Sequence, residues 1–303
     1  MRHRASSADR VSTLLFLAGL ALAVPDAYAA DRAGSMHFSV DYQYISVDGF
    51  EGTAGEVPIG TVDTHVWNFE FEYAATDRLT LSAGIPLLRR RYQGTFPHDP
   101  RILDPPRDAE FIDDGEYHTD FQDFHLGIRY LWKTRPLIVE PFVYLGIPSN
   151  DYPFFAHSAV GQNLWKVDVG ANLVYFPTLS DFFYGARVAR VFVEETLGTN
   201  IDHWRVDGQV GYFFTPRVAG RAFLMVKEGN GLDFPDDFPP PRTDERWYQH
   251  DRMVKHNFVN AGVGVDWAVS ERYGLSFSVL RMIHAENIHI VEYAVNFGLS
   301  VEF

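Results

Sequence analysis

The last sixteen residues of the chain alternate between apolar side chains and polar or small ones. The apolar positions are every second residue from Val291 to Phe303, and Glu292, Asn296 and other polar or small residues lie between them. Side chains two residues apart share one face of a β-strand, whereas a helix repeats about every 3.6 residues. Residues 288–303 are therefore predicted to be a strand with one apolar and one polar face.

The first 29 residues have the pattern of a secretory signal peptide. Three arginines precede an apolar run over residues 11–24, and a small-residue site ends at Ala29. The run is shorter than the roughly twenty residues that a membrane-spanning helix needs. We predict a signal peptide over residues 1–29 and a mature chain over residues 30–303.

Composition narrows the fold and the function. No later segment has enough uninterrupted apolar residues for a spanning helix, so a membrane protein with this sequence has to cross with strands. Aromatic residues make up 15% of the chain and hydrophobic residues 46%, which favours a polar-lined barrel with aromatic belts. The net charge of −14, or −15 without residues 1–29 (three Arg, two Asp), disfavours nucleic acid as a partner. The absence of cysteine excludes disulfides and thiol catalysis.

Segments with a period of two recur about twelve times, and the connections between them alternate between short and long. The short ones are rich in Thr, Ser, Asp, Pro or Arg, which is typical of tight turns: residues 75–78, 134–136, 177–181, 215–217 and 270–272. The others cover residues 48–61, 93–118, 148–163, 194–202, 228–255 and, briefly, 284–287. Short turns opposite long loops are the asymmetry of outer-membrane barrels.

The chain is therefore predicted to be an all-β protein, a transmembrane antiparallel up-and-down β-barrel of about twelve strands, with short periplasmic turns and long extracellular loops. The last strand is predicted to pair with the first, near residues 36–46, which removes both sheet edges. Residues 182–193 fit least well, because Arg187 and Arg190 fall on opposite faces.

The two faces of the strands have different predicted roles. Outward aromatic residues recur beside the short turns, as expected for an interface belt: Tyr73, Trp132, Tyr175, Phe214 and Trp267. The inward positions are predicted to line a pore with charges of both signs. They are Asp41, Glu70, Glu72, Arg90, Asp123, His125, Arg129, Glu140, Lys166, Asp168, Arg187, Arg205, Asp207, Arg221, Asp266 and Glu292.

Three of the loops are predicted to gate this pore: residues 93–118, 148–163 and 228–255. The middle one contains Tyr152, Phe154 and Phe155, which are predicted to fold inward as a hydrophobic constriction. The other two are acidic, which favours solvated surface loops, with Ca²⁺ bridging or folding into the mouth as the alternatives.

The twelve histidines are scattered over loops and strand ends, and no His-Glu-x-x-His motif occurs. Histidines lie beside carboxylates at residues 118–125 and 284–289, but solvated histidines are the stronger interpretation. No metal site and no cofactor are predicted.

A barrel phospholipase is the enzyme alternative to a channel. Its mechanism needs a Ser hydroxyl within reach of an oriented imidazole. Ser278 points inward by the alternation, with no His of matching phase, so no catalytic residue is predicted. A structural or adhesive barrel that binds a partner through its acidic loops is the third alternative.

Several stretches of the chain resemble the outer-membrane channel family labelled "meta-pathway of phenol degradation", which is distantly like the long-chain fatty acid transporters. These stretches are residues 76–86, 123–130, 146–149, 263–276 and 296–303. The resemblance implies a passive channel in outer-membrane lipid for small hydrophobic or aromatic molecules.

The two ends of the mature chain bear on this resemblance. Phe303 is similar to the C-terminal signature of outer-membrane barrels, which implies recognition by the barrel insertion machinery. Unlike the fatty acid transporters, the chain has only a few residues between Ala30 and the first strand near Met36, too few for an N-terminal plug.

Overall fold

The structure, a computed structural model, describes residues 33–95, 98–103, 105–133, 136–238 and 245–303. The predicted signal peptide lies outside the described residues. Within them, fourteen strands form one antiparallel sheet. The strands are β1 (Met36–Gly52), β2 (Gly55–Ala74), β3 (Leu79–Gly94), β4 (His118–Phe121), β5 (Asp123–Tyr130), β6 (Trp132–Lys133), β7 (Leu137–Pro148), β8 (Lys166–Tyr175), β9 (Phe182–Val193), β10 (His203–Thr215), β11 (Val218–Gly229), β12 (Asn257–Ala268), β13 (Tyr273–Glu286) and β14 (Ile288–Glu302).

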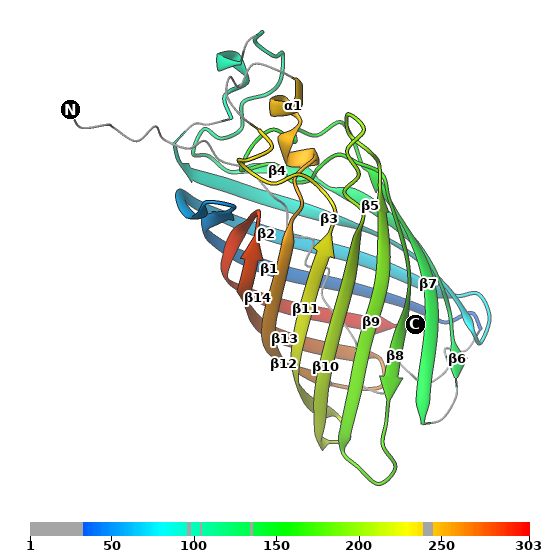
Figure 1. Ribbon diagram of the computed structural model, residues 1–303. Coiled ribbons are helices and arrows are strands. Elements are labelled where there is room, and N and C mark those ends of the chain that lie inside the picture. Colours follow the sequence, from blue (N-terminus) through cyan, green and yellow to red (C-terminus); the bar gives the residue numbers. More distant parts are fainter. Residues whose placement is uncertain (1–32, 96–97, 104, 134–135, 239–244) are drawn as a thin grey trace.

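The sheet closes into a barrel of twelve crossing strands (Figure 1). β4, β5 and β6 are successive pieces of one crossing strand, because β4 and β5 pair with β3 while β5 and β6 pair with β7. The predicted fold class and strand number are confirmed. Among the described residues, no helix is long and apolar enough to cross a membrane.

Closure depends on the pairing of β14 with β1, as predicted. Tyr42 lies opposite Phe297, and Gln43 lies opposite Asn296. The pairing reaches the last residue, since the Phe303 amide donates a 2.8 Å hydrogen bond to the Met36 carbonyl. Among the described residues, each of the twelve crossing strands therefore pairs with a neighbour on both sides, and the sheet is closed.

The outward face carries a continuous apolar band. In β10, every second residue from Trp204 to Phe214 points outward, and these two end residues are 51% and 65% exposed. Ten residue steps at about 3.4 Å, tilted by about 40°, give a height of about 26 Å. That height matches the apolar band of outer-membrane barrels, about 25 Å.

Three of the short turns are held by a hydroxyl placed two residues before an arginine. Thr76 Oγ1 accepts hydrogen bonds from the amides of Arg78 (3.2 Å) and Leu79 (2.9 Å). Thr215 and Ser270 accept in the same way from residues 217 and 272. The side chain takes the place of a backbone acceptor, so the chain reverses within a few residues.

Two predicted loops are largely strand. Residues 48–61 continue the β1–β2 pairing, which ends with Gly52 opposite Gly55. Only Asn287, at positive φ of 52°, separates β13 from β14. These strands extend beyond the length needed to cross a bilayer, so the predicted loops are in part paired strand.

A β-bulge corrects the predicted orientation of Glu292. Ser46 pairs with Tyr293 and Val47 with Val291, so Glu292 is an extra residue in β14. The Glu292 side chain is exposed and accepts a hydrogen bond from Ser46 Oγ, while Val291 is buried inside the barrel. The alternation therefore changes phase at this point, and Glu292 does not face the lumen.

The orientation of β9 is resolved by its neighbours. Arg187 points inward, with its Cζ 4.4 Å from the centroid of the Phe142 ring. Arg190 points outward near the strand end, where Nη2 lies 3.8 Å from Asp202 Oδ2 and Cζ lies 5.6 Å from the Trp204 ring. Both arginines are thus paired although they lie on opposite faces.

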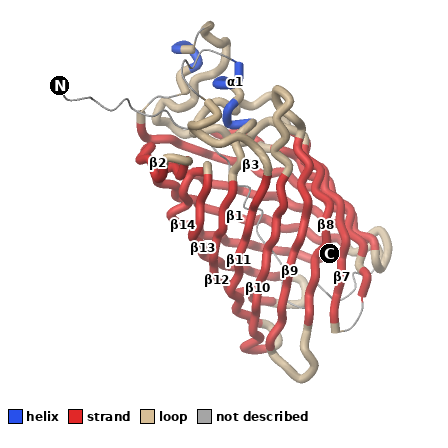
Figure 2. Tube along the Cα trace, viewed as in Figure 1, coloured by secondary structure: helices blue, strands red, loops and turns tan. Residues whose placement is uncertain are grey.

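Three loops gather over one end of the barrel, which we call the loop end; the short turns lie at the opposite turn end (Figure 1). The described parts of these loops are residues 95, 98–103 and 105–117 with η2 (Pro100–Ile102), residues 149–165, and residues 230–238 and 245–256 with α1 (Glu245–Tyr248) and η3 (His250–Arg252). Figure 2 shows the helical segments confined to this end. We call the three loops together the plug.

Two glycines of β10 provide a matched test of packing inside and outside the barrel. A Cβ at inward Gly211 would lie 2.0 Å from the Phe183 ring, whereas a Cβ at outward Gly208 would meet no atom within 4 Å. Gly211→Ala is expected to lower the free energy of unfolding by about 1–3 kcal/mol through overpacking. Gly208→Ala is expected to be neutral or stabilising by up to about 1 kcal/mol.

Urea unfolding of both variants in detergent micelles measures the difference. Equal stability of the two variants would contradict the assignment of the faces of β10.

Candidate functional site

A ladder of polar contacts runs along the lumen wall on β2, β5, β7 and β8, and its contact between β2 and β5 reaches across β3, which lies between them. Arg129 Nη2 lies 2.7 Å from Glu72 Oε2, and Arg129 Nη1 lies 3.4 Å from Glu140 Oε2. Asn172 Nδ2 extends the ladder by donating to the same Glu140 oxygen at 2.9 Å. His125 Nε2 contacts Glu70 Oε2 beside it. Polar groups from β2, β5, β7 and β8 thus neutralise one another inside the barrel.

Further pairs continue around the wall. Arg205 Nε lies 3.1 Å from Asp207 Oδ2, within β10. Arg221 Nε lies 2.9 Å from Asp266 Oδ2, between β11 and β12. Asp41 and Asp168 also lie on inward positions of their strands and are half-buried. Both signs of charge therefore occur along the inner wall.

Asp123 links the wall to the plug. The carboxylate is 1% exposed, and Lys166 Nζ lies 3.1 Å from Oδ2. The Tyr152 hydroxyl donates to Asp123 Oδ1 and accepts a 3.0 Å hydrogen bond from the Asn163 amide. Burial and the neighbouring carboxylate raise the pKa of the Tyr152 phenol, so that Tyr152 stays a donor. One phenol thus holds residues 149–165 against β5.

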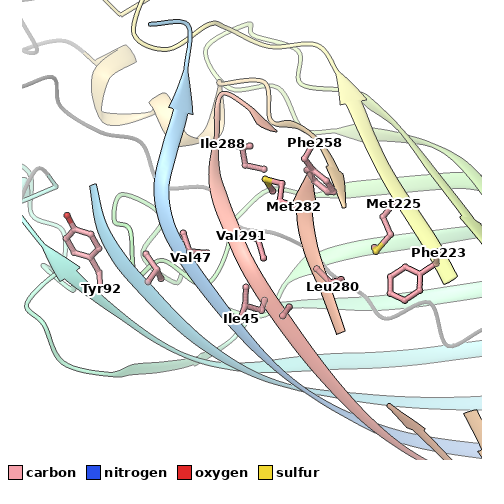
Figure 3. Close-up of a cluster of buried hydrophobic side chains, with 12 residues drawn as sticks. Ile45, Val47, Tyr92, Phe223, Met225, Phe258, Leu280, Met282, Ile288 and Val291 are labelled. Carbon is pink, nitrogen blue, oxygen red and sulfur yellow. The ribbon is translucent and has the colours of Figure 1, made fainter. Parts of the chain in front are cut away.

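The inner wall near the loop end is apolar. Figure 3 shows aliphatic, aromatic and methionine side chains from neighbouring strands in this cluster. Its buried members are Ile45, Val47, Val62, Tyr92, Phe223, Met225, Phe258, Leu280, Met282, Ile288, Val291 and Ala294. We call this cluster the apolar wall. The sequence predicts charged residues along the inner wall. In the structure, the inner wall is divided into an apolar part near the loop end and a charged part.

The apolar wall has a partial signal in the sequence. In β1, the inward positions change from Asp41 and Gln43 to Ile45 and Val47, whereas the outward positions change from Tyr42 and Tyr44 to Ser46 and Asp48. Apolar side chains on the inner face need partners that shield them from water. The change along β1 therefore indicates a packed layer inside the barrel near the loop end.

The plug supplies that layer. Tyr152 and Phe155 are buried, and Phe154 is half-buried with Arg252 Cζ 4.5 Å from its ring. Arg90 is buried and its Nη1 donates to the Ala159 carbonyl at 2.7 Å. This loop therefore packs against the barrel wall, and its role as a gate stays a prediction.

The two acidic loops are packed at the loop end, against the preferred prediction of solvated loops. Ile112 and Asp113 are buried in residues 95–117, and Trp247, His250 and Asp251 are buried in residues 230–256. The apolar members pack with each other, as Trp247 does with Phe50, Ile59 and Phe234. Burial of these apolar groups explains why the loops are not solvated.

Histidines and carboxylates meet at the centre of the plug. Two groups with metal-ligand spacing occur among the described residues, and His98 belongs to both: one adds Asp113 and His157, the other His250 and Asp251. The pairings weighed from the sequence are different. His118 contacts Asp114, His125 contacts Glu70, and His284 is exposed. The residues that do meet lie on loops far apart in the sequence, so no short sequence motif identifies them.

The comparisons with known proteins agree with this fold. A crystal structure of an outer membrane channel from Pseudomonas putida F1 matches with a TM-score of 0.69 at 16% identity, covering 91% of this chain and 98% of that chain. More distant are the CymD monoaromatic hydrocarbon channel and the NanC porin, each with a TM-score of 0.47. The CymD match has 10% identity and covers 92% of this chain and 91% of CymD. The NanC match has 9% identity and covers 88% of this chain and 98% of NanC.

Among curated protein sequences, none matches this chain. A family model does match, over residues 59–297, which span β2 to β14 and the whole plug. The matched region also includes four of the stretches on which the resemblance was based, apart from the last residues of the closing strand. The chain belongs to the family described as the putative MetA-pathway of phenol degradation.

Proposed function

We propose that this protein is an outer-membrane channel for the passive uptake of small hydrophobic or aromatic molecules. The single observation that carries the proposal is the division of the lumen into an apolar wall under the plug and a charged ladder beyond it. Transfer of an apolar solute from water to the apolar wall lowers its free energy by about 25 cal/mol per Å² of buried apolar surface. The charged ladder is too polar to retain it, so the solute can leave.

The orientation and surroundings of the barrel follow from the same proposal. The apolar band faces outer-membrane lipid, both termini lie in the periplasm, and the plug faces outside. Residues 1–29 direct export, and Phe303 contacts the insertion machinery. Pore-lining roles are proposed for the ladder residues and Asp41, Asp168, Arg187, Arg205, Asp207, Arg221 and Asp266.

A channel is favoured over a barrel hydrolase by the environment of Ser278. Its hydroxyl is buried in the lumen and accepts a 3.0 Å hydrogen bond from Asn296 Nδ2. A nucleophilic serine needs an imidazole in that place. The similar solved structure from Pseudomonas putida F1 is itself a channel.

The plug is expected to limit conductance. The double variant Tyr152→Ala/Phe155→Ala removes the phenol bound to Asp123 and a buried ring, which loosens residues 149–165 from the wall. Single-channel conductance in planar bilayers should rise several-fold. The control double variant Trp165→Ala/Leu197→Ala changes two exposed residues and should conduct like the unaltered protein.

Absence of conductance in both the unaltered protein and the Tyr152→Ala/Phe155→Ala variant would refute the channel. A rise of the same size in the control would show that the plug is not the constriction.

The apolar wall is expected to bind aromatic solutes during passage. Benzyl alcohol should interrupt the ion current for longer than glycerol does. Leu280→Asn should shorten the interruptions by benzyl alcohol about tenfold, which corresponds to a loss of about 1.4 kcal/mol. Gln209→Asn, which exchanges one polar lumen side chain for another, should leave them unchanged. Equal interruptions by the two solutes would contradict a preference for aromatic molecules.

A further inference from the structure

His98, Asp113 and His157 form a closed group inside the plug. Their exposed fractions are 1%, 0% and 0%. His98 and Asp113 lie in residues 95–117, whereas His157 lies in residues 149–165. Two separate loops therefore bring their polar side chains to one dry point above the barrel wall.

The distances within the group suit a small cation. One ligand atom from each residue lies within 4.8 Å of the others, and His98 Nδ1 is 3.4 Å from Asp113 Oδ2. A tetrahedral Zn²⁺ ion with ligands at about 2.0–2.1 Å places neighbouring ligand atoms about 3.3 Å apart. The loops need only small adjustments to complete such a site.

The imidazoles of this group have unused nitrogens. Both ring nitrogens of His98 and Nε2 of His157 are buried without a hydrogen-bond partner. A buried polar atom without a partner costs about 1–3 kcal/mol.

Outer contacts hold the three side chains in place. Asp113 accepts hydrogen bonds from the amides of His157 (2.9 Å) and Ser158 (2.8 Å). His157 Nδ1 lies 3.3 Å from His289 Nε2, and a proton shared there leaves the lone pair of His157 on Nε2. His98 Nε2 lies 4.0 Å from Asp251 Oδ2. A carboxylate or another polar group behind each ligating imidazole is the usual support of a metal site.

We propose that His98 Nδ1, Asp113 Oδ2 and His157 Nε2 bind one divalent transition-metal ion of the zinc type. Two imidazoles and one carboxylate are borderline N/O donors, which Zn²⁺ prefers and Ca²⁺ does not. One imidazole donates one lone pair to a metal ion, so His98 serves either this group or the one with His250 and Asp251. The shorter distance to Asp113 and the two amides that hold its carboxylate favour this group.

The ion joins two loops of the plug directly and the third through Asp251. An ion that binds only the assembled plug stabilises the closed arrangement by mass action. The site does not depend on transport, because it stands on the geometry of the loops alone.

Zinc titration of the untagged, chelator-treated barrel in detergent, by calorimetry with metal analysis, tests the proposal. One Zn²⁺ per chain is expected, and Co²⁺ should give the visible spectrum of a tetrahedral site. Asp113→Asn and His157→Gln should weaken Zn²⁺ binding at least a hundredfold. Asp251→Asn, which removes an outer contact, should weaken it about tenfold. His284→Ala, an exposed histidine on β13, should have no effect.

Circular dichroism verifies that each variant retains the barrel. Absence of stoichiometric Zn²⁺ binding by the folded unaltered chain overturns the site, as does unchanged affinity in Asp113→Asn. If Asp251→Asn abolishes binding while Asp113→Asn keeps it, the ion belongs to the His250 group and the assignment is wrong. None of these readouts requires conductance, so failure of the site is distinguishable from failure of the channel.

Discussion

The hydrogen-bonded closure between β1 and β14 is the constraint on which the rest of the structure depends. In hydrocarbon, each unpaired backbone N–H or C=O costs several kilocalories per mole, so a spanning sheet cannot keep an edge. The pairing of Tyr42 with Phe297 also fixes which residues face lipid. A slip of one residue would turn the outward row of β14 into the lumen and its polar row into lipid. Closure therefore determines the pore as well as the fold.

Much of the wall follows from the sequence because a strand in this setting obeys two local rules. Alternation assigns residues such as Arg129 and Glu72 to the inner face, and the hydroxyl-containing turns at Thr76 and Ser270 mark where strands reverse. Both rules act over a few residues. Neither rule predicts the bulge at Glu292. One extra residue exchanges the inward and outward faces for all residues on one side of it, and no local sequence pattern indicates where it occurs.

The interior of the plug is beyond sequence reasoning for another reason. His98, Asp113 and His157 lie on loops without periodicity, and only tertiary packing brings them together. The acidic composition of residues 101–120 predicts that this loop is exposed to solvent. In the structure, Asp113 of this loop is fully buried. The apolar wall is an intermediate case. Ile45 and Val47 are visible as inward apolar residues, but the side chains that they pack with come from strands far away in the sequence.

The plug combines two kinds of contact that differ in how they resist opening. The apolar wall is non-directional and rich in adaptable methionine, so loops can shift along it at little cost. Directional contacts also hold the plug, among them Tyr152 to Asp123, Arg90 to the Ala159 carbonyl, and Arg252 to the Asn163 carbonyl. Local stability differs across a protein. The twelve strands are held by continuous ladders of backbone hydrogen bonds, whereas these loops are held by separate contacts, so we expect the plug to open at a lower free energy than the barrel.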